Sequence, residues 1–285
     1  MSKQFPSSVS LPTMTALEPR QLFASYTVTE VFPGAVRSVG RQVTDDGIVV
    51  GASFTGVGGT PFFWRPETGA TEFALGTNFW PYDTNNKGVV LGNFRSSNGY
   101  VYGTYDVKTN TLTPAPSIVG SRITLVAIND SGQMAGTRDS TLHQKNVAVR
   151  ITGQTVEEFL MPDQTQAAVV AAINNHGDMI GIYQRGVNGT PFLVRGTTPQ
   201  ALPSAFGGYT QLSDINDAGQ ISGKGYNPAS GSEDAFRWDD TGYTNLNLVT
   251  GSGYGTAAIN EWGQIVGDRA GGYVTTGTST QYLDD

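Results

Sequence analysis

A ten-residue motif occurs twice in this chain in closely similar form, and shorter forms of it recur at a nearly constant spacing. The two full copies are AINDSGQMAG at residues 127–136 and AINEWGQIVG at residues 258–267. The first glycine of the motif recurs six times, at Gly47, Gly88, Gly132, Gly177, Gly219 and Gly263. Successive motif glycines are 41, 44, 45, 42 and 44 residues apart. A period of this length indicates a repeat architecture.

The motif has the chemistry of a tight β-hairpin. An Asn three residues before the glycine can accept a hydrogen bond from the backbone two residues further on. The glycine suits the left-handed conformation of a three-residue loop with a β-bulge, where another residue would cost roughly 1–2 kcal/mol. Four residues after each motif glycine comes a second glycine, at 51, 92, 136, 181, 223 and 267. We expect neighbouring sheets to approach closely at this second glycine.

Two more strands follow each hairpin. The first repeat continues with PFFWR at 61–65 and TEFAL at 71–75, and the fifth with AFRW at 235–238 and YTNL at 243–246. Four short strands in about 43 residues are typical of a propeller blade. The sequence therefore predicts an all-β protein, a six-bladed β-propeller of four-stranded antiparallel blades. A parallel β-helix or solenoid is the rival fold, although its repeats are usually shorter than 43 residues.

The predicted propeller occupies residues 25–285, and residues 1–24 form an export-associated or disordered segment. The sequence leaves the closure of the ring open. Residues 26–32 have the pattern of an outer strand that could complete the sixth blade from the N-terminal side. Residues 279–283 have the same pattern, so one of the two strands is surplus.

Composition excludes several classes of function. The net charge is −7 and no Lys/Arg-rich run is present, which argues against nucleic-acid binding. The chain has no cysteine and only two histidines, which excludes disulfides and Cys-ligated zinc and makes a multi-histidine metal centre improbable. No apolar run approaches the ~18 residues that a membrane helix needs. We expect a monomer with no cofactor and no transmembrane segment.

The six copies of Ile/Val-Asn-x-x-Gly, with PFFWRPETG and AFRWDDTG between them, resemble the HAF-type extracellular repeat family. The resemblance covers residues 26 to about 285, and it implies a secreted or surface protein of β-propeller type without pointing to any activity. Thr44 and Thr84 depart from the pattern. The segment ALEPRQLFA at 16–24 is similar to the LEPR-x-LL segment of large exported bacterial proteins, with Phe23 in place of a Leu. Both resemblances imply an extracellular or cell-surface location.

Two regularities are interpreted as structural. Arg65, Arg150 and Arg195 occupy similar positions in the third strands, which indicates packing or ion pairing between blades. The stretches GVGGTPFFWR at 56–65 and GVNGTPFLVR at 186–195 lie three blades apart and suggest a ring with pseudo-twofold symmetry.

A ligand is expected on the face that carries the turns between the second and third strands and the connections between blades. The turns of the repeated motif are uniform, whereas the connections on this face vary in length and composition. Trp80 and Tyr82, in an expected loop, could stack a sugar or an apolar ligand. Alternatively, Trp80 fills the space between blades.

Arginines on the same face could hold an acidic group by bidentate pairing, or could simply be solvated. The predicted ligand-binding residues are Trp80, Tyr82, Arg95, Arg122, Tyr183, Arg185 and Tyr209.

No catalytic residue is predicted. His143 lies near Asp139 and Ser140, but proximity in sequence is not the geometry of a triad. Several acids are available for glycoside cleavage, and nothing selects two of them. Calcium could bind at Asp45 and Asp46, yet no known loop spacing is present.

Three hypotheses of function remain. The first is an exported binding module for glycans or cell-envelope partners. The second is a carbohydrate-active hydrolase or lyase with acids at the central channel, and the third is a structural repeat of a surface assembly. Acids converging with an Arg or Tyr at the channel would favour the enzyme, whereas an aromatic shelf without such acids would favour binding.

Overall fold

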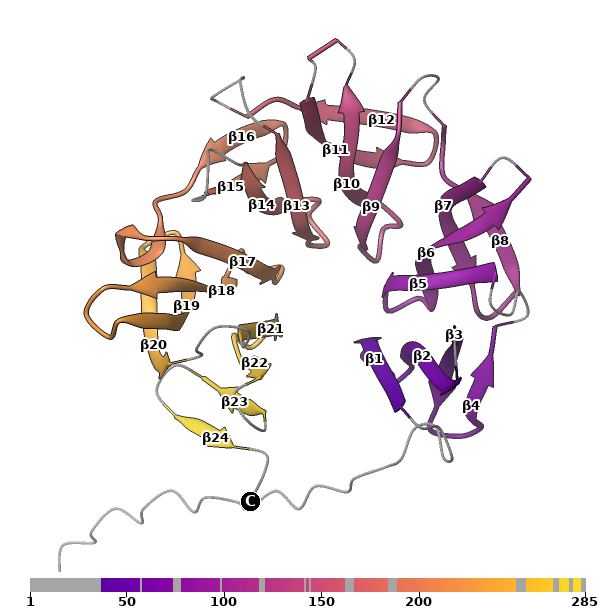
Figure 1. The fold of residues 1–285 in the computed structure, drawn as a ribbon, viewed down its shortest axis with the longest axis horizontal. Coiled ribbons are helices and arrows are strands. Elements are labelled where there is room, and N and C mark those ends of the chain that lie inside the picture. The colour runs from indigo at the N-terminus through magenta and orange to yellow at the C-terminus, as the bar shows by residue number, and fades with distance from the viewer. Residues whose placement is uncertain are drawn as a thin grey trace, which may run out of the picture. The chain divides into compact units, whose positions relative to one another are not determined.

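The computed structural model contains six four-stranded antiparallel sheets, which follow one another along the chain as blades (Figure 1). It describes residues 37–282 apart from 57, 74–77, 98, 118–120, 141, 144, 162–166, 184–188, 250–254, 269–271 and 277–278. Blade 1 comprises β1 (Arg37–Val43), β2 (Val49–Gly56), β3 (Gly58–Arg65) and β4 (Gly69–Glu72). Blade 2 comprises β5 (Phe79–Thr84), β6 (Val89–Ser96), β7 (Gly99–Asp106) and β8 (Thr111–Pro114). Blade 3 comprises β9 (Ile123–Ile128), β10 (Met134–Ser140), β11 (Lys145–Thr152) and β12 (Thr155–Phe159).

The second half of the ring repeats this arrangement. Blade 4 comprises β13 (Ala168–Ile173), β14 (Met179–Tyr183), β15 (Thr190–Arg195) and β16 (Thr198–Ala201). Blade 5 comprises β17 (Thr210–Ile215), β18 (Ile221–Asn227), β19 (Ser232–Asp239) and β20 (Gly242–Val249). Blade 6 comprises β21 (Gly255–Ile259), β22 (Ile265–Asp268), β23 (Tyr273–Thr275) and β24 (Thr280–Tyr282). The prediction of a six-bladed propeller with four-stranded antiparallel blades is confirmed.

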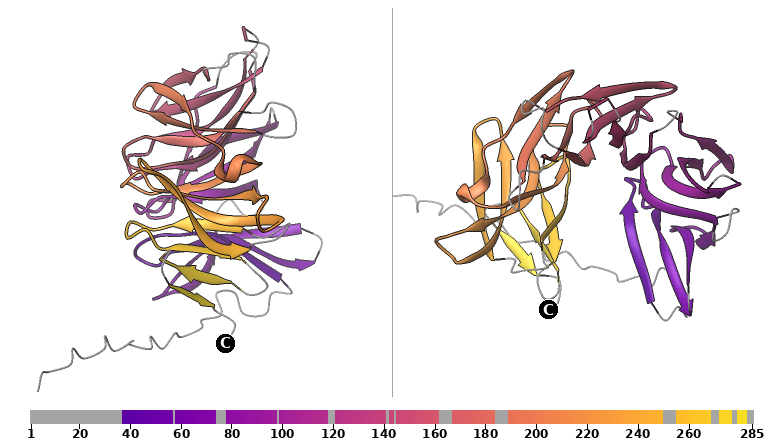
Figure 2. Two further views of the ribbon diagram at one scale, coloured as in Figure 1. Left: turned by 90° about the vertical axis from the view of Figure 1, so that its left-hand side faces the viewer. Right: turned by 45° about the horizontal axis from the view of Figure 1, so that its top comes forward.

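The first strand of each blade is the innermost, and these inner strands contact one another in chain order from β1 to β21 (Figure 1). The side view of Figure 2 shows the sheets of blades 4, 5 and 6 in the same order. Blade 6 takes all four of its strands from the C-terminal part of the chain, with β24 as the outer one. The expected strand at 279–283 is thus confirmed, while the alternative at 26–32 lies outside the described residues.

The core consists of five apolar clusters, each of which joins two consecutive blades. Between blades 1 and 2, for example, Phe73 packs edge-on against Phe63 and Tyr105. Between blades 3 and 4, Phe159 and Phe192 belong to one cluster. Within the described residues, no such cluster joins blade 6 to blade 1. Stability therefore depends on contacts between neighbouring sheets, as it does in other repeat proteins.

The repeated motif forms the turn between the first and second strands of each blade, here called the A–B turn. In blade 3 the N–H of Gly132 donates to the carbonyl of Asn129 over 2.9 Å, and Gly132 has a φ of 77°. The N–H of Asn129 in turn donates to the carbonyl of Gln133. These bonds define the predicted three-residue loop with a glycine bulge.

The motif asparagine also connects blades 2, 3, 4 and 5 to the next blade. The Oδ1 of Asn129 accepts hydrogen bonds from the N–H groups of Ser131 and Gln133, and its Nδ2 donates to the carbonyl of Asn174 in blade 4 over 2.9 Å. The same bond to the next blade is made by Asn85, Asn174 and Asn216. The asparagine therefore has two roles, of which only the one within the turn was predicted from sequence.

The second glycine of the motif is required within a blade, which corrects the expectation that it lets neighbouring sheets approach. A Cβ on Gly136 would lie 2.0 Å from the carbonyl oxygen of Thr124, on the adjacent strand of the same blade. At Gly181 it would lie 2.1 Å from the carbonyl oxygen of Val169. The inner strand carries a β-bulge near this glycine, and the bulge leaves no room for a side chain.

The repeated arginines reach from one blade to the next, as predicted. Arg150 donates to the carbonyl of Gly177 over 2.7 Å, and Arg195 pairs with Asp240 over 3.2 Å. Arg65 donates to the carbonyl of Val107 over 3.4 Å. Strand register shows that Arg65 and Arg195 are equivalent, since each follows by three residues the Phe that pairs with the second glycine. Arg150 occupies a different position, because it follows the corresponding residue directly.

Replacing Asn129 by Thr should weaken the junction between blades 3 and 4. Thr can keep an acceptor for the turn, as Thr44 does for the N–H of Ile48 in blade 1. It cannot donate to the carbonyl of Asn174, which keeps only the bond from the N–H of Gly177, and the bond from the Asn129 Nδ2 to the Gln133 Oε1 is lost as well. We expect the free energy of unfolding, measured by urea denaturation, to fall by about 1–3 kcal/mol.

The exposed Ser131 of the same turn provides the control, because its side chain makes no hydrogen bond within the described residues. Ser131→Ala should change the free energy of unfolding by less than about 0.5 kcal/mol. Equal effects of the two substitutions would contradict a bridging role for Asn129.

Candidate functional site

The six A–B turns surround one mouth of a central cavity of about 900 Å³. The second residue of each turn lines this mouth, and all of these residues carry a carboxylate or an amide. They are Asp45, Asn86, Asp130, Asn175, Asp217 and Glu261. Their side chains are engaged with the scaffold: the N–H of Asn86 donates to Asp130 over 2.7 Å, and that of Asn175 donates to Asp217 over 2.7 Å. Asp130, Asp217 and Glu261 therefore form a belt of hydrogen bonds between neighbouring blades.

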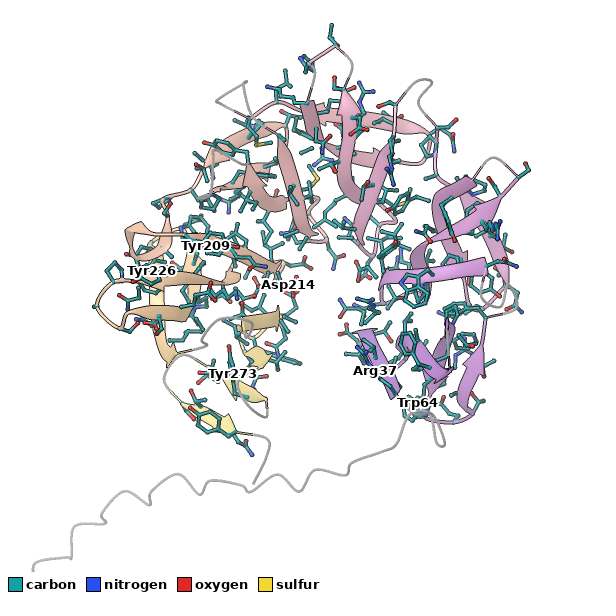
Figure 3. All side chains as sticks on the ribbon, viewed as in Figure 1. Arg37, Trp64, Tyr209, Asp214, Tyr226 and Tyr273 are labelled. Carbon is teal, nitrogen blue, oxygen red and sulfur yellow. The ribbon has the colours of Figure 1, made fainter. Side chains whose placement is uncertain are left out.

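Two further carboxylates, Asp83 and Asp214, lie on inner strands three blades apart. Figure 3 shows Asp214 on the inner side of the ring. Asp83 accepts hydrogen bonds from the N–H of Thr84 over 2.8 Å and from that of Ile128 in blade 3 over 2.7 Å. Asp214 makes the corresponding bonds to Ile215 and to Ile259 in blade 6.

Burial raises the pKa of both carboxyl groups. The pKa of Asp83 rises from 3.8 to about 7, because desolvation outweighs the two backbone N–H donors. The pKa of Asp214 rises for the same reason. Raised carboxyl pKa values often mark catalytic acids, but both groups here bridge backbone amides of neighbouring blades. The arrangement is that of structural bridges.

An aromatic pocket of about 360 Å³ lies between blades 2 and 3. It lies at the start of β7 and along the connection from β8 to β9, which is the face where the sequence predicted a ligand. Its lining residues are Tyr82, Asn93, Tyr100, Val101, Tyr102, Ala115, Pro116, Ser117, Ser121, Arg122 and Ile123. Among these described residues none is acidic. We call this cavity the tyrosine pocket.

Tyr82 and Tyr102 form the aromatic part of the tyrosine pocket. Their rings stack with centroids 5.7 Å apart and planes inclined by 26°. The Nδ2 of Asn93 donates to the hydroxyl of Tyr82 over 2.8 Å, which fixes the ring position. Burial and the neighbouring Tyr102 raise the pKa of Tyr82 to about 12, while the charge of Arg41 acts in the opposite direction. Tyr82 is therefore a neutral phenol near pH 7.

The rim of the tyrosine pocket is exposed. The side chain of Tyr100 is 73% exposed, and its strand neighbour across the turn is Arg95. Arg122 is exposed at the start of the connection into β9. The pocket thus combines a stacked aromatic base with amide, hydroxyl and guanidinium groups, a combination suited to a small polar ligand with apolar faces.

The structure brings together two of the seven predicted ligand-binding residues, Tyr82 and Arg122. Trp80 does not line the pocket and packs edge-on against Phe54 of blade 1, with ring centroids 6.3 Å apart. Trp80 and Tyr82 lie in strand β5, which corrects the expectation of a loop. Arg95 is exposed on β6 beside the pocket.

The remaining predictions fall elsewhere. Tyr183 is only 7% exposed and belongs to the core between blades 3 and 4. Tyr209 lies on the far side of the ring in blade 5, close to Tyr226 (Figure 3). Arg185 lies outside the described residues.

Sequence reasoning missed Tyr100 and Tyr102, which contribute most of the remaining aromatic surface. Both lie in β7 and pair with residues of β6 that follow the second glycine, Gly92. Asn93 pairs with Tyr102, and Arg95 pairs with Tyr100. The signal was present, because antiparallel pairing from Gly92 predicts which side chains share a face. The turn between β6 and β7 had to be placed correctly before it could be used.

The catalytic and metal hypotheses find little support. The Oγ of Ser140 accepts the backbone N–H of His143 over 3.2 Å, so this hydroxyl caps a turn. In the described ranges, no three His, Cys, Asp or Glu side chains gather in a way that could hold a metal ion. At Asp45–Asp46, the hydroxyl of Thr44 donates to the carboxylate of Asp46. Within the residues that the structure describes, no helix is long and apolar enough to cross a membrane.

The protein is similar in fold to several solved propellers. The β-propeller domain of the Trilobed protease from Pyrococcus furiosus, described as having an open velcro topology, matches with a TM-score of 0.60, 9% identity, and coverage of 88% of this chain and 84% of that one. A streptogramin B lyase matches with a TM-score of 0.56, 13% identity and coverage of 88% and 84%. An acylaminoacyl peptidase from Pyrococcus horikoshii matches with a TM-score of 0.58 and 12% identity, and the chain spans 44% of its length.

These likenesses show the fold alone, because all three identities are far below the level at which activity can be transferred. No protein-family model and no curated protein matches the sequence.

Asp83 gives the folded protein a pH dependence that the Asp83→Asn variant should lack. Its pKa of about 7 in the fold exceeds the value of 3.8 expected without burial. Between these values the folded protein keeps a proton that the unfolded chain loses. This contribution to stability is complete below the lower pKa and is lost as pH rises through the higher one. The free energy of unfolding of the wild type relative to the variant should therefore fall from pH 4 to pH 7, by at most about 1.4 kcal/mol per pH unit.

Asp239 provides a control of opposite sign. The hydroxyl and the N–H of Thr241 lower its pKa. The contribution of Asp239 to stability is present above its unfolded pKa and is lost as pH falls. The free energy of unfolding of the wild type relative to Asp239→Asn should therefore decrease toward acid pH. Urea denaturation from pH 7 down to below pH 4 measures both slopes, with that of Asp239 at the acid end, and a flat difference for Asp83→Asn would show that the carboxyl is not protonated in the fold.

Proposed function

We propose that this protein is a binding module which holds a sugar-sized ligand in the tyrosine pocket. The observation that carries this proposal is the stacked Tyr82–Tyr102 pair, which has polar groups at its edge and no acid in the described lining. The hydrophobic faces of a sugar ring pack on aromatic rings, and its hydroxyls need the kind of donors and acceptors that Asn93, Ser121 and Arg122 supply. The pocket volume of about 360 Å³ suits one or two sugar residues.

The tyrosine pocket is an asymmetric feature of a repetitive ring. The position of Tyr82, at the bulge of the inner strand, is occupied in the other blades by Arg41, Val126, Ala171, Ser213 and Ala257. The position of Tyr102 is occupied by Pro61, Ala148, Pro191 and Ala235 in blades 1, 3, 4 and 5. Packing requirements that are common to all blades do not explain aromatic residues at both positions in blade 2 alone. A single ligand site would explain them.

A hydrolase or lyase is the weaker alternative. It needs free carboxylates near a substrate, and Asp83 and Asp214 each accept two backbone N–H groups. Asp130, Asp217 and Glu261 of the A–B turns are likewise hydrogen-bonded to neighbouring blades. A role as a structural repeat of a surface assembly is the third hypothesis, and the binding experiment below discriminates against it.

We also propose that the protein works outside the cytoplasm, at the cell surface, with glycans or envelope proteins as partners. The support is the resemblance of its repeat to HAF-type sequences and of residues 16–24 to an export-associated segment. Protease digestion of intact cells, followed by detection of the protein, tests this location. Protection of the protein in intact cells and its loss after lysis would refute it.

A glycan array with the full chain tests the binding proposal. We expect saturable binding to a defined set of glycans, and at least tenfold weaker binding by the Tyr100→Ala variant, because an aromatic contact at the rim is lost. Tyr100 is suited to this test because its side chain is 73% exposed, so that its removal leaves the fold intact.

Tyr226→Ala is the matched control, since Tyr226 is 44% exposed in blade 5 and lies outside the pocket. It should bind glycans as the wild type does. Absence of binding to every glycan would overturn the proposal in favour of a structural or protein-binding role. Equal loss in both variants would place the site elsewhere.

A further inference from the structure

Three arginines surround the tyrosine pocket. Arg122 lines it, and Arg95 is the cross-strand neighbour of Tyr100 at its rim. Arg41 belongs to the inner strand of blade 1 and occupies the same bulge position there as Tyr82 does in blade 2. Its charge lowers the pKa of the Tyr82 hydroxyl, so Arg41 lies within electrostatic reach of the pocket.

None of these three arginines makes an ion pair with any described residue. Arg138, Arg150 and Arg195 each pair with a carboxylate, whereas Arg37, Arg65 and Arg237, which do not line the pocket, make no ion pair with a described residue. In a chain of net charge −7, acids are available to neutralise exposed arginines. Unpaired guanidinium groups around one pocket therefore form a local positive region on an acidic protein.

The nearby acids do not cancel this region. Glu158 is bound to Arg138, and the acids of the A–B turns lie at the opposite mouth of the ring. Asp139 is the acid closest to Arg122 along the strand pairing, because its backbone N–H donates to the Arg122 carbonyl over 2.9 Å. Its carboxylate does not line the pocket and makes no ion pair with Arg122. Arg122 is thus the one charged side chain in the described lining of the pocket.

We infer that the ligand of the tyrosine pocket is an acidic sugar, whose ring stacks on the Tyr82–Tyr102 pair and whose carboxylate pairs with Arg122. This inference rests on the proposed function and adds the ligand class. A guanidinium group offers two parallel N–H donors that match the two oxygens of a carboxylate, so Arg122 can both attract and orient the ligand. Arg41 and Arg95 add a field that draws an anion toward the pocket.

Titration calorimetry with digalacturonate and with its fully methyl-esterified form tests this inference, because the two probes share the same sugar rings and differ in charge. We expect the free acid to bind at least tenfold more tightly than the ester, since the charge-assisted pair with Arg122 is lost in the ester. The preference should decrease with added salt. Arg122→Gln should abolish it, and Arg122→Lys should restore part of it.

Lys87→Gln is the control for net charge. Lys87 is exposed in the A–B turn of blade 2, at the opposite mouth, so this variant removes one positive charge far from the pocket. It should keep the preference for the acid. Equal affinity for acid and ester, or an equal loss in Arg122→Gln and Lys87→Gln, would overturn the inference.

The outcomes also separate this inference from the proposed function. Binding of neutral glycans that depends on Tyr100 but shows no preference for acids would refute the acidic ligand and leave the binding module intact. Absence of binding for every glycan, neutral or acidic, would refute both.

Discussion

The hydrogen bond from the motif asparagine to the carbonyl of the next asparagine is the interaction on which the propeller depends. A β-sheet satisfies its own backbone groups, but nothing in a single blade fixes its angle to the next blade. From blade 2 to blade 6 these bonds supply that link at the inner end of the sheets, for example from Asn129 to Asn174 and from Asn174 to Asn216, at 2.9 and 3.1 Å. The apolar clusters between blades then fill the wider space further out. Polar turns set the geometry and apolar side chains supply most of the stability.

This construction determines which face is free to bind a ligand. The belt of turns uses the acids of one mouth as acceptors for backbone N–H groups, so few of them remain available for a ligand. The connections on the other face have no common hydrogen-bonding task, and their residues can differ from blade to blade. The stacked Tyr82–Tyr102 pair and the unpaired Arg122 are found there. Because the repeated turn lies at one face and links the blades there, the other face is the one that can vary and bind a ligand.

The pseudo-twofold relation between the two halves of the ring shows how a site can arise on such a scaffold. Asp83 and Asp214 occupy equivalent positions and make equivalent bonds to the next blade. Beside them the halves differ, because Ser213 and Lys224 stand where blade 2 has Tyr82 and Asn93. Ser213 is hydrogen-bonded to Thr256, and Lys224 is paired with Glu233 over 2.8 Å. Paired polar side chains thus occupy in blade 5 the positions that Tyr82 and Asn93 occupy in the tyrosine pocket.

The sequence alone determined the number of blades, the turn type and the position of each A–B turn, because a glycine with positive φ and an Asn that folds back on its own turn are local requirements. It also placed Tyr82 and Arg122 among the ligand candidates. Only the tertiary structure showed that Asn129 reaches the next blade, that Gly136 is needed against its own inner strand, and that Trp80 packs on Phe54. It also added Tyr100 and Tyr102 to the pocket and removed Tyr183 from it. These outcomes depend on how strands pair and how sheets face one another, and residues about 45 positions apart meet only when the ring has formed.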